Sequence, residues 1–335
     1  MFNKVTPDIV SSLKEIAGNE NVFIDADSIQ NYSHDYTEDF SFPPEVVVKP
    51  SNTDEVSSIL KLANEYKIPV VPRGGGTGLS GGALPLYGGI CLSMERFKKI
   101  IEIDEENFQA VVEPGVITQV FQEECEKRNL FYPPDPASRG SCFLGGNLAE
   151  CSGGPKAVKY GVTKDYVLGL EFVTVSGEII NTGARVLKNS TGYNLTQLII
   201  GSEGTLGIIT KIYFKLLPLP AKKKVILVAY NSIDECASSV AKIFQAGIIP
   251  SALEMMERSA IDAARKQLGK EFPNSEAEAQ LLIEVDGNYE DALDKDIERI
   301  AEVVSDAGAF DIVMAEDNNK MAELWALRRC IGEAV

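Results

Sequence analysis

The sequence predicts an α+β protein with two domains, the second of which follows a ferredoxin-like pattern. Three observations lead to this prediction. The chain has 335 residues, which is enough for two domains. Segments with helical periodicity alternate with short segments that favour strands. The turn Pro218-Leu219-Pro220 separates two stretches of different composition.

The first stretch contains several expected elements. Residues 6–17 indicate a short amphipathic helix, and Asn52 with Glu55 resembles a capping box that begins a helix through about Lys67. Residues 132–161 are crowded with Gly, Pro and Ser, and we expect an ordered, irregular binding segment there. The other elements expected are strands at 45–50, 68–72, 89–93, 99–103, 108–113, 168–175 and 205–217, and a helix at 117–128.

The second stretch predicts a β-α-β-β-α-β order once one inserted helix is set aside. The last helix, from residue 318 onward, has no clear C-terminal cap, so we expect a truncated chain or fragment whose second domain is incomplete. The domains expected are a helical lead-in at 1–40, a first domain at 41–220 and a partial second domain at 221–335. The second domain's elements are strands at 223–230, 250–256, 280–286 and 310–314, and helices at 232–246, 257–268, 290–306 and from 318.

Composition excludes several classes of function. The formal net charge of −17 argues against a nucleic-acid partner, which would require a basic face. The six cysteines form no CxxC pair, so neither an iron–sulfur nor a structural zinc site is supported, and scattered cysteines fit a reducing compartment. The N-terminus does not resemble a signal peptide, and no run of about 18 apolar residues is present. We expect a cytoplasmic protein, with peripheral membrane association left open.

The residues Gly76-Thr77-Gly78-Leu79-Ser80-Gly81 match the GxGxxG expression, and a strand precedes them. A Rossmann glycine loop must open a helix whose N-terminus faces the phosphates. The residues that follow, 82–89, are rich in Gly and Pro and cannot form that helix. We therefore reject the Rossmann interpretation.

The same glycines still favour binding of an anion. Glycines at 74, 75, 76 and 78 permit positive φ and close backbone approach, so successive N–H groups can form a concave nest for a pyrophosphate. Arg73 would add charge or play a structural part, and the alternative is a plain turn. Two more glycine clusters, at 145–154 and 201–207, favour an extended ligand over a mononucleotide.

The segments PRGGGTGLSGG, PPDPAS, LGGNLAECSGGPKAVKYGVTKDYVLGLEFV and GSEGTLGIIT resemble the FAD-binding domain of the vanillyl-alcohol-oxidase/PCMH flavoprotein superfamily. Within it the chain is most similar to the FAD-linked 2-hydroxyacid dehydrogenases, the group of the glycolate oxidase flavin subunit, acceptor-dependent D-lactate dehydrogenase and D-2-hydroxyglutarate dehydrogenase. The resemblance covers about 40–220 strongly and 221–335 more weakly. It implies a two-subdomain PCMH-type FAD-binding domain followed by a cap domain.

The resemblance also implies which residues hold FAD. In members with covalent flavin a His or Cys forms the tether; the matching loop position here is Thr77, and residues 142–152 do not fit the tether pattern, which implies non-covalent FAD. The pyrophosphate contacts implied are Pro72, Arg73, Gly74, Gly75, Gly76, Thr77, Gly78 and Ser80. The ribityl and isoalloxazine contacts implied are Ser141, Gly145, Gly146, Asn147, Ser152, Gly154, Tyr160, Gly161 and Val167. The adenosine half and flavin edge are assigned to Glu203, Gly207, Ile208 and Ile209.

A substrate residue is implied in the second domain. The segment Leu324-Trp325-Ala326-Leu327-Arg328-Arg329 resembles the W-x-L-R segment of this group, and Arg328 would grip the substrate carboxylate bidentately. The alternatives are a solvated helix arginine paired with Glu323 or Glu333, and simple core packing for Trp325. The only histidine, His34, matches no catalytic position and is expected at the surface or a helix end. No metal ligands are expected in this chain; the family's divalent metal would belong to the full-length protein.

The implied activity is oxidation of a small 2-hydroxy acid, D-lactate or glycolate first, by hydride transfer to flavin N5. Electrons would then pass to an acceptor other than NAD, such as a quinone, a cytochrome, an electron-transfer flavoprotein or a partner subunit. Two alternatives stay open. The chain would be a flavin-binding fragment without turnover that needs a missing C-terminal segment or a partner, or a superfamily relative with another chemistry, such as ether-lipid synthesis.

Overall fold

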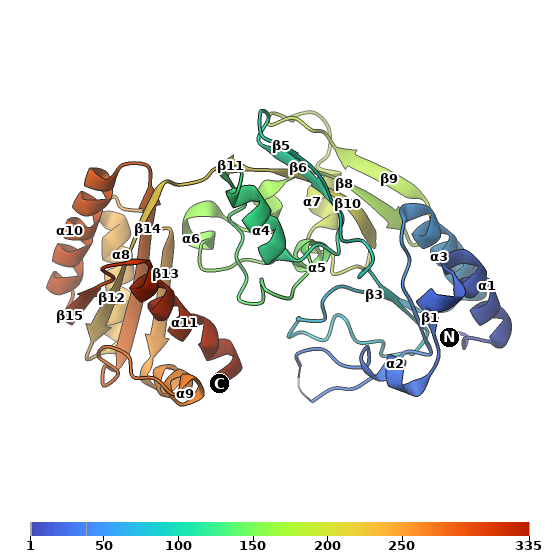
Figure 1. Ribbon diagram of the computed structural model, residues 1–335, viewed down its shortest axis with the longest axis horizontal. Helices are drawn as coiled ribbons and strands as arrows, with labels where there is room; N and C mark the ends of the chain where they lie inside the picture. The colour runs from blue at the N-terminus through green and yellow to red at the C-terminus, as the bar shows by residue number, and fades with distance from the viewer. Residues whose placement is uncertain (1, 38, 335) are drawn as a thin grey trace. The chain divides into compact units, whose positions relative to one another are not determined.

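The computed structural model describes residues 2–37 and 39–334, which fold as two compact units (Figure 1). The first unit contains residues up to Tyr132, Ser138–Ser152 and Val162–Pro218. The second contains Pro133–Ala137, Gly153–Gly161 and the chain from Leu219 onward. Two short segments that precede Leu219 in sequence therefore belong to the second unit.

The first unit begins with a four-stranded sheet of order β1-β2-β4-β3. Strands β2, β4 and β3 are parallel, and Ile90 of β4 lies opposite both Val46 and Val70. The predicted helices α1 and α3 are confirmed and cover the sheet with apolar side chains such as Leu13 and Ile59. The bounds are α1 Pro7–Ala17, β1 Val22–Phe23, α2 Ala26–Gln30, β2 Val46–Val48, α3 Thr53–Tyr66, β3 Val70–Arg73 and β4 Ile90–Ser93.

Helix α3 begins as the sequence predicts. The Asn52 side chain accepts a hydrogen bond from the Glu55 main-chain nitrogen at 2.9 Å, which satisfies one donor of the first turn. The Glu55 carboxylate in turn accepts from the Ser51 nitrogen at 2.7 Å. The helix ends at Lys67 in the left-handed conformation, after which the chain enters β3.

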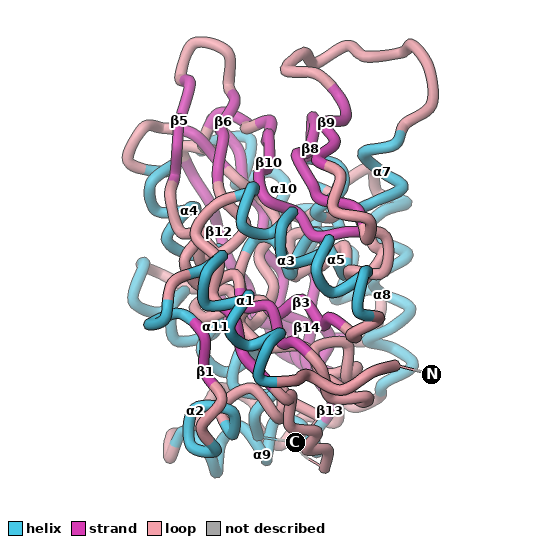
Figure 2. The backbone as a smooth tube through the Cα atoms, turned by 90° about the vertical axis from the view of Figure 1, so that its right-hand side faces the viewer, coloured by secondary structure: helices cyan, strands magenta, loops and turns pink. Residues whose placement is uncertain are grey.

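The first unit continues with a five-stranded antiparallel sheet of order β5-β6-β10-β8-β9. The sequence pattern predicts β5, β6, β8 and β10 but misses β9 and helix α7, because the exposed residues between β9 and α7 carry no apolar periodicity. That stretch forms a long loop from β9 to α7 (Figure 2). The bounds are β5 Ile100–Asp104, β6 Gln109–Val112, α4 Thr118–Glu126, β7 Leu130–Phe131, β8 Val167–Thr174, β9 Ile179–Gly183, α7 Leu195–Ile199, β10 Gly207–Lys215 and β11 Leu217–Pro218.

The segment at 132–161 is ordered, but the expectation that it is irregular throughout is wrong. It contains the short helices α5, Leu144–Glu150, and α6, Ala157–Tyr160. Glycine content hid α5, since Gly145 and Gly146 both lie in its first turn. Tertiary contacts replace the missing propensity. A Cβ on Gly145 would lie 2.6 Å from the Pro114 Cβ, so the helix packs closely there.

The second unit has a four-stranded antiparallel sheet of order β13-β14-β12-β15, which confirms the ferredoxin-like pattern. Helices α8 and α10 pack on one face over residues such as Ile226 and Ile283, and α9 and α11 pack on the other over Val225 and Leu282 (Figure 1). The bounds are β12 Lys222–Tyr230, α8 Ile233–Gln245, β13 Ala252–Glu257, α9 Arg258–Leu268, β14 Ala279–Gly287, α10 Glu290–Asp306, β15 Ala309–Met314 and α11 Asn318–Ala334.

Candidate functional site

The glycine-rich loop runs from the end of β3 at Arg73 to the start of β4 at Ile90 without forming a helix. The Rossmann interpretation is therefore excluded by the structure, as the sequence predicts. Gly76 has φ +69°, a conformation that side chains with a Cβ rarely adopt. A Cβ at that position would also lie 2.4 Å from Arg73 Nη2, so the main chain of Gly76 rests directly against the guanidinium group.

The second glycine cluster packs against this loop. A Cβ on Gly75 would lie 2.6 Å from the Ser141 main-chain oxygen, and a Cβ on Gly74 would lie 3.8 Å from the Gly146 main chain. Only glycine allows the first of these approaches. Two segments that are about seventy residues apart in sequence thus form one backbone surface. Within it, a Cβ on Gly146 would meet no atom within 4 Å, so the space in front of this helix turn is open.

The third glycine cluster joins the same surface. The Glu203 nitrogen donates to the Ala149 main-chain oxygen at 2.9 Å, and the Gly201 nitrogen donates to Leu148 at the same distance. A Cβ on Gly204 would lie 2.7 Å from Pro72 Cγ, so the third cluster also packs against strand β3, which precedes the first cluster. Glu203 itself has φ +51°, an unusual conformation for a residue with a side chain.

Arg73 supplies a buried positive charge beneath the glycine loop. The residue is 7% exposed, and its Nη2 donates to the His34 main-chain oxygen at 2.8 Å. Nη1 has no hydrogen-bond partner among the described residues, although buried donors are almost always paired. An unpaired donor under a glycine nest fits an anionic group such as the pyrophosphate of FAD. The His34 side chain is exposed, as expected.

Three carboxylates lie near this surface: the predicted Glu203, and Glu150 and Asp35, which the sequence did not indicate. A Cβ on Gly78 would lie 2.9 Å from Glu150 Oε1, and one on Gly82 would lie 3.6 Å from Glu203 Oε2. Burial raises the pKa of Glu150, and the charges of Glu203 and Asp35 add to the rise, against a hydrogen bond with Ser152 that lowers it. No sequence signal reveals this group, because its members are neighbours only in three dimensions. These carboxylates place negative charge at the backbone surface of the three glycine clusters, beside the positive charge of Arg73.

Other predicted residues of the first unit contribute main chain more than side chain. Asn147 is buried, and its Nδ2 donates to Thr118 Oγ1 at 2.6 Å, which joins α5 to the start of α4. Ile208 and Ile209 are buried in β10, where Ile208 packs in the core of the first sheet. The structure brings the predicted residues at 72–78 and 141–147 together with Glu203. Gly154, Tyr160 and Gly161 fold with the second unit.

Within the second unit, Tyr160 and its neighbours are bound to strand β14. The Tyr160 hydroxyl donates to both carboxylate oxygens of Asp286 at 2.9 Å, and Lys159 Nζ contacts the same carboxylate at 2.5 Å. Two residues earlier along the strand, the Glu284 carboxylate accepts from Lys156 Nζ at 2.5 Å. Alternate residues of a strand share one face, so both carboxylates point toward segment 153–161.

Arg328, the predicted substrate residue, lies on α11, and its Nε donates to Glu254 of β13. Its side chain is 30% exposed, and its ion pair is with Glu254, whereas the alternative interpretation expects Glu323 or Glu333. Trp325, one turn earlier, packs in the core formed by α9, α11 and the sheet. Its indole Nε1 donates to Glu284 at 2.9 Å.

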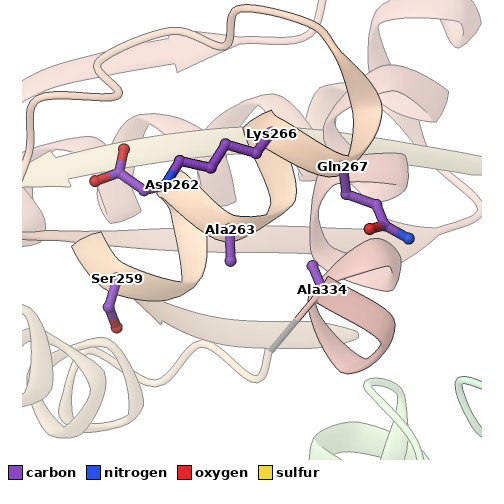
Figure 3. Close-up of a pocket in the computed structure, with 6 residues that line it drawn as sticks. All are labelled: Ser259, Asp262, Ala263, Lys266, Gln267 and Ala334. Atoms are coloured by element: carbon purple, nitrogen blue, oxygen red, sulfur yellow. The ribbon is translucent and has the colours of Figure 1, made fainter.

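A surface hollow of about 570 Å³ lies between α9 and the end of α11 (Figure 3). It contains no predicted cofactor or substrate residue and is not part of the candidate site. Its lining residues are Ser259, Asp262, Ala263, Lys266, Gln267 and Ala334. Across residues 2–37 and 39–334 there is no cluster of three or more His, Cys, Asp or Glu side chains that could hold a metal. The same residues contain no helix long and apolar enough to cross a membrane.

Two family models match the chain. Residues 44–183 match the family model described as an FAD binding domain, and residues 219–335 match that of the C-terminal domain of FAD linked oxidases. Glycolate oxidase subunit GlcD of Bacillus subtilis (strain 168) is 42% identical over 97% of this chain and 69% of its own length. D-lactate dehydrogenase of Anaerostipes hadrus is 40% identical over 100% of this chain and 71% of its own length.

Solved structures share the fold at lower identity. p-Cresol methylhydroxylase has a TM-score of 0.81 at 20% identity and is matched over 98% of this chain and 70% of its own. 4-Ethylphenol oxidase from Gulosibacter chungangensis has a TM-score of 0.80 at 22% identity, over 100% of this chain and 71% of its own. The converging glycine clusters, the two matching family models and the relatives at 40% identity or more lead to one conclusion: the chain belongs to the FAD-linked oxidases, and its cofactor is FAD.

Proposed function

We propose that the chain is an FAD-dependent dehydrogenase that oxidises a small 2-hydroxy acid, with D-lactate and glycolate as the first candidates. The observation that carries the proposal is the convergence of three glycine clusters over the buried, partly unpaired guanidinium of Arg73. The names of the glycolate oxidase and D-lactate dehydrogenase relatives support the substrate class. FAD, when bound, supplies the acceptor for the hydride that leaves C2 of the substrate.

The residues of this chain would bind and orient. Main-chain groups at 74–78 would hold the pyrophosphate, with the Arg73 charge beneath them. The predicted contacts at Ser141–Asn147 and Glu203–Ile209 would hold the rest of the cofactor, largely through main chain. Arg328 would bind the substrate carboxylate: Glu254 accepts from its Nε, which leaves the two Nη groups as a fork for a bidentate pair.

The test is anaerobic addition of glycolate, D-lactate and L-lactate to the FAD-loaded protein. We expect loss of the visible flavin absorbance with at least one of these acids. In Arg328→Lys, the loss of the planar fork should raise KM by about 10- to 100-fold. Arg299→Lys, a change at an exposed arginine of α10, is the matched control and should leave KM unchanged. Bound FAD that no 2-hydroxy acid reduces would refute turnover by this chain and favour the flavin-binding alternative.

We further propose non-covalent FAD, a non-NAD electron acceptor and a partner subunit. Cys142 is buried, so it is a poor candidate for a flavin tether, and the GlcD relative is named as a subunit of its enzyme. Cys91, Cys125, Cys142 and Cys236 are buried, and scattered cysteines without CxxC spacing fit a reducing compartment such as the cytoplasm. Acid precipitation should release the flavin into solution, and reoxidation should proceed with an artificial dye but not with NAD⁺.

A further inference from the structure

A second polar centre lies in the second unit, around a carboxylate that the proposed chemistry does not use. Glu284 lies on β14, an inner strand that pairs with both β12 and β13. Its side chain is only 3% exposed. A carboxylate at this depth is costly to keep ionised unless its oxygens are hydrogen-bonded and its charge is balanced.

Three donors from three different parts of the unit satisfy Glu284. Lys156 Nζ, from segment 153–161, donates to Oε1 at 2.5 Å. Ser251 Oγ, just before β13, donates to the same oxygen at 3.1 Å. Trp325 Nε1, from helix α11, donates to Oε2 at 2.9 Å. Oε1 therefore binds segment 153–161 and the residue before β13, and Oε2 binds helix α11.

Stability alone gives little reason for this arrangement. A buried ion pair is often no more stable than apolar side chains of similar volume, because the desolvation penalty offsets the attraction between the charges. Breaking such a pair, by contrast, leaves an uncompensated buried charge. The pair of Lys156 and Glu284 is therefore better suited to fixing one arrangement of the chain than to adding stability.

The two elements tied to Glu284 carry predicted ligand residues. Segment 153–161 contains Gly154 and Tyr160, which the sequence predicts as cofactor contacts. Helix α11 contains Arg328 one turn after Trp325, so both side chains lie on the same side of the helix. Separate carboxylates hold each element alone: Asp286 binds segment 153–161, and Glu254 binds Arg328.

We propose that Glu284 is a positioning residue that couples segment 153–161 to helix α11, so that the placement of the predicted cofactor contacts and the orientation of Arg328 are set together. The proposal rests on the proposed function in its assignment of Arg328 to the substrate. Among the described residues, the carboxylate of Glu254 binds only helix α11 and that of Asp286 binds only segment 153–161, whereas that of Glu284 binds both.

The first test uses three amide variants in the FAD-loaded chain. Glu284→Gln should weaken FAD binding and raise KM for the hydroxy acid, each by about 10-fold, since one charge-assisted hydrogen bond is lost. Glu254→Gln should raise KM and leave the FAD dissociation constant unchanged. Asp286→Asn should do the reverse. Glu278→Gln, at an exposed carboxylate before β14, is the control and should change neither constant.

The second test needs no turnover. Trp325 is the only tryptophan, so its fluorescence reports on Glu284 directly. Lys156→Gln should change the Trp325 emission through Glu284, and the same substitution added to Glu284→Gln should have no further effect. This test stands even if no hydroxy acid reduces the flavin, which separates its failure from failure of the proposed function. The proposal is overturned if Lys156→Gln leaves the Trp325 emission unchanged. It is also overturned if Glu284→Gln alters only the FAD dissociation constant or only KM.

Discussion

Arg73 donates from Nη2 to the main-chain oxygen of His34 at 2.8 Å, while Nη1 of the same buried guanidinium has no partner among the described residues. The relationship places a half-satisfied cation under the glycine loop. Arg73→Met should therefore weaken FAD binding by about 10- to 100-fold, the equivalent of one charge-assisted hydrogen bond. Titration of the apoprotein with FAD measures this constant.

Arg96→Met is the control for Arg73. Arg96 is exposed, and its Nη1 also donates to a main-chain oxygen, that of Lys49 at 3.0 Å. Removing it should leave FAD affinity unchanged. Equal losses in the two variants would mean that charge in general, and not the guanidinium beneath the loop, determines binding.

Gly146 offers a test of occupancy that does not disturb the protein itself. A Cβ there meets no protein atom within 4 Å, and alanine favours a helix over glycine by about 1 kcal/mol. Gly146→Ala should therefore keep or raise the stability of the apoprotein but weaken FAD binding, because the methyl group enters the space assigned to the cofactor. Thermal unfolding without FAD and titration with FAD measure the two effects.

Gly332→Ala is the matched variant, since Gly332 of α11 also has open space around its Cβ position. It should give the helix stabilisation without the loss of FAD affinity. If Gly146→Ala binds FAD as tightly as the wild type, the cofactor does not occupy this space.

The raised pKa of Glu150 predicts a charge effect on cofactor binding. Burial and the neighbouring carboxylates of Glu203 and Asp35 disfavour its ionised form, and the pyrophosphate of FAD would add further negative charge. Since the folded-state pKa lies above the ordinary value of 4.5, ionised Glu150 disfavours the folded state as pH rises through that raised pKa. Glu150→Gln should therefore stabilise the apoprotein at neutral pH and tighten FAD binding by about 2- to 5-fold.

The pH dependence distinguishes this effect from a local change in packing. The advantage of Glu150→Gln should disappear in acid, where the wild-type carboxyl is protonated as well. Glu65→Gln, at an exposed position of α3, should show no gain at any pH. A gain for Glu150→Gln that persists unchanged in acid would contradict the electrostatic explanation.

The pair of Lys156 and Glu284 predicts an acid-sensitive contribution to stability. Burial raises the pKa of Glu284, but the charge and hydrogen bond of Lys156 outweigh it, and the folded-state pKa lies below the ordinary value of 4.5. The stabilisation is therefore present above pH 4.5 and is lost as pH falls through the lower folded-state pKa. Denaturant unfolding of the second unit, followed by Trp325 fluorescence, should show a smaller loss of stability in acid for Glu284→Gln than for the wild type. Equal acid sensitivity in both proteins would contradict this prediction.

The sequence by itself determined which kind of ligand the three glycine clusters favour. Gly-rich segments at 74–78, 145–154 and 201–207 predict a backbone site for an extended anion, and the absence of a helix after the first of them excludes the Rossmann alternative, which the structure confirms. Periodicity likewise predicted the ferredoxin-like order of the second unit. These features are local: a strand, a helix or a permissive glycine is encoded by residues a few positions apart.

Only the tertiary structure decided how those local features meet. Gly75 reaches Ser141, and Glu203 bonds to Ala149, because chain segments distant in sequence pack without a Cβ between them. Helix α5 forms despite its glycines because packing against Pro114 compensates for their low propensity. The surroundings of Glu150 and Glu284 were equally invisible, since the energy of a charge depends on which groups share its low-dielectric space, and residue spacing along the chain does not specify those groups.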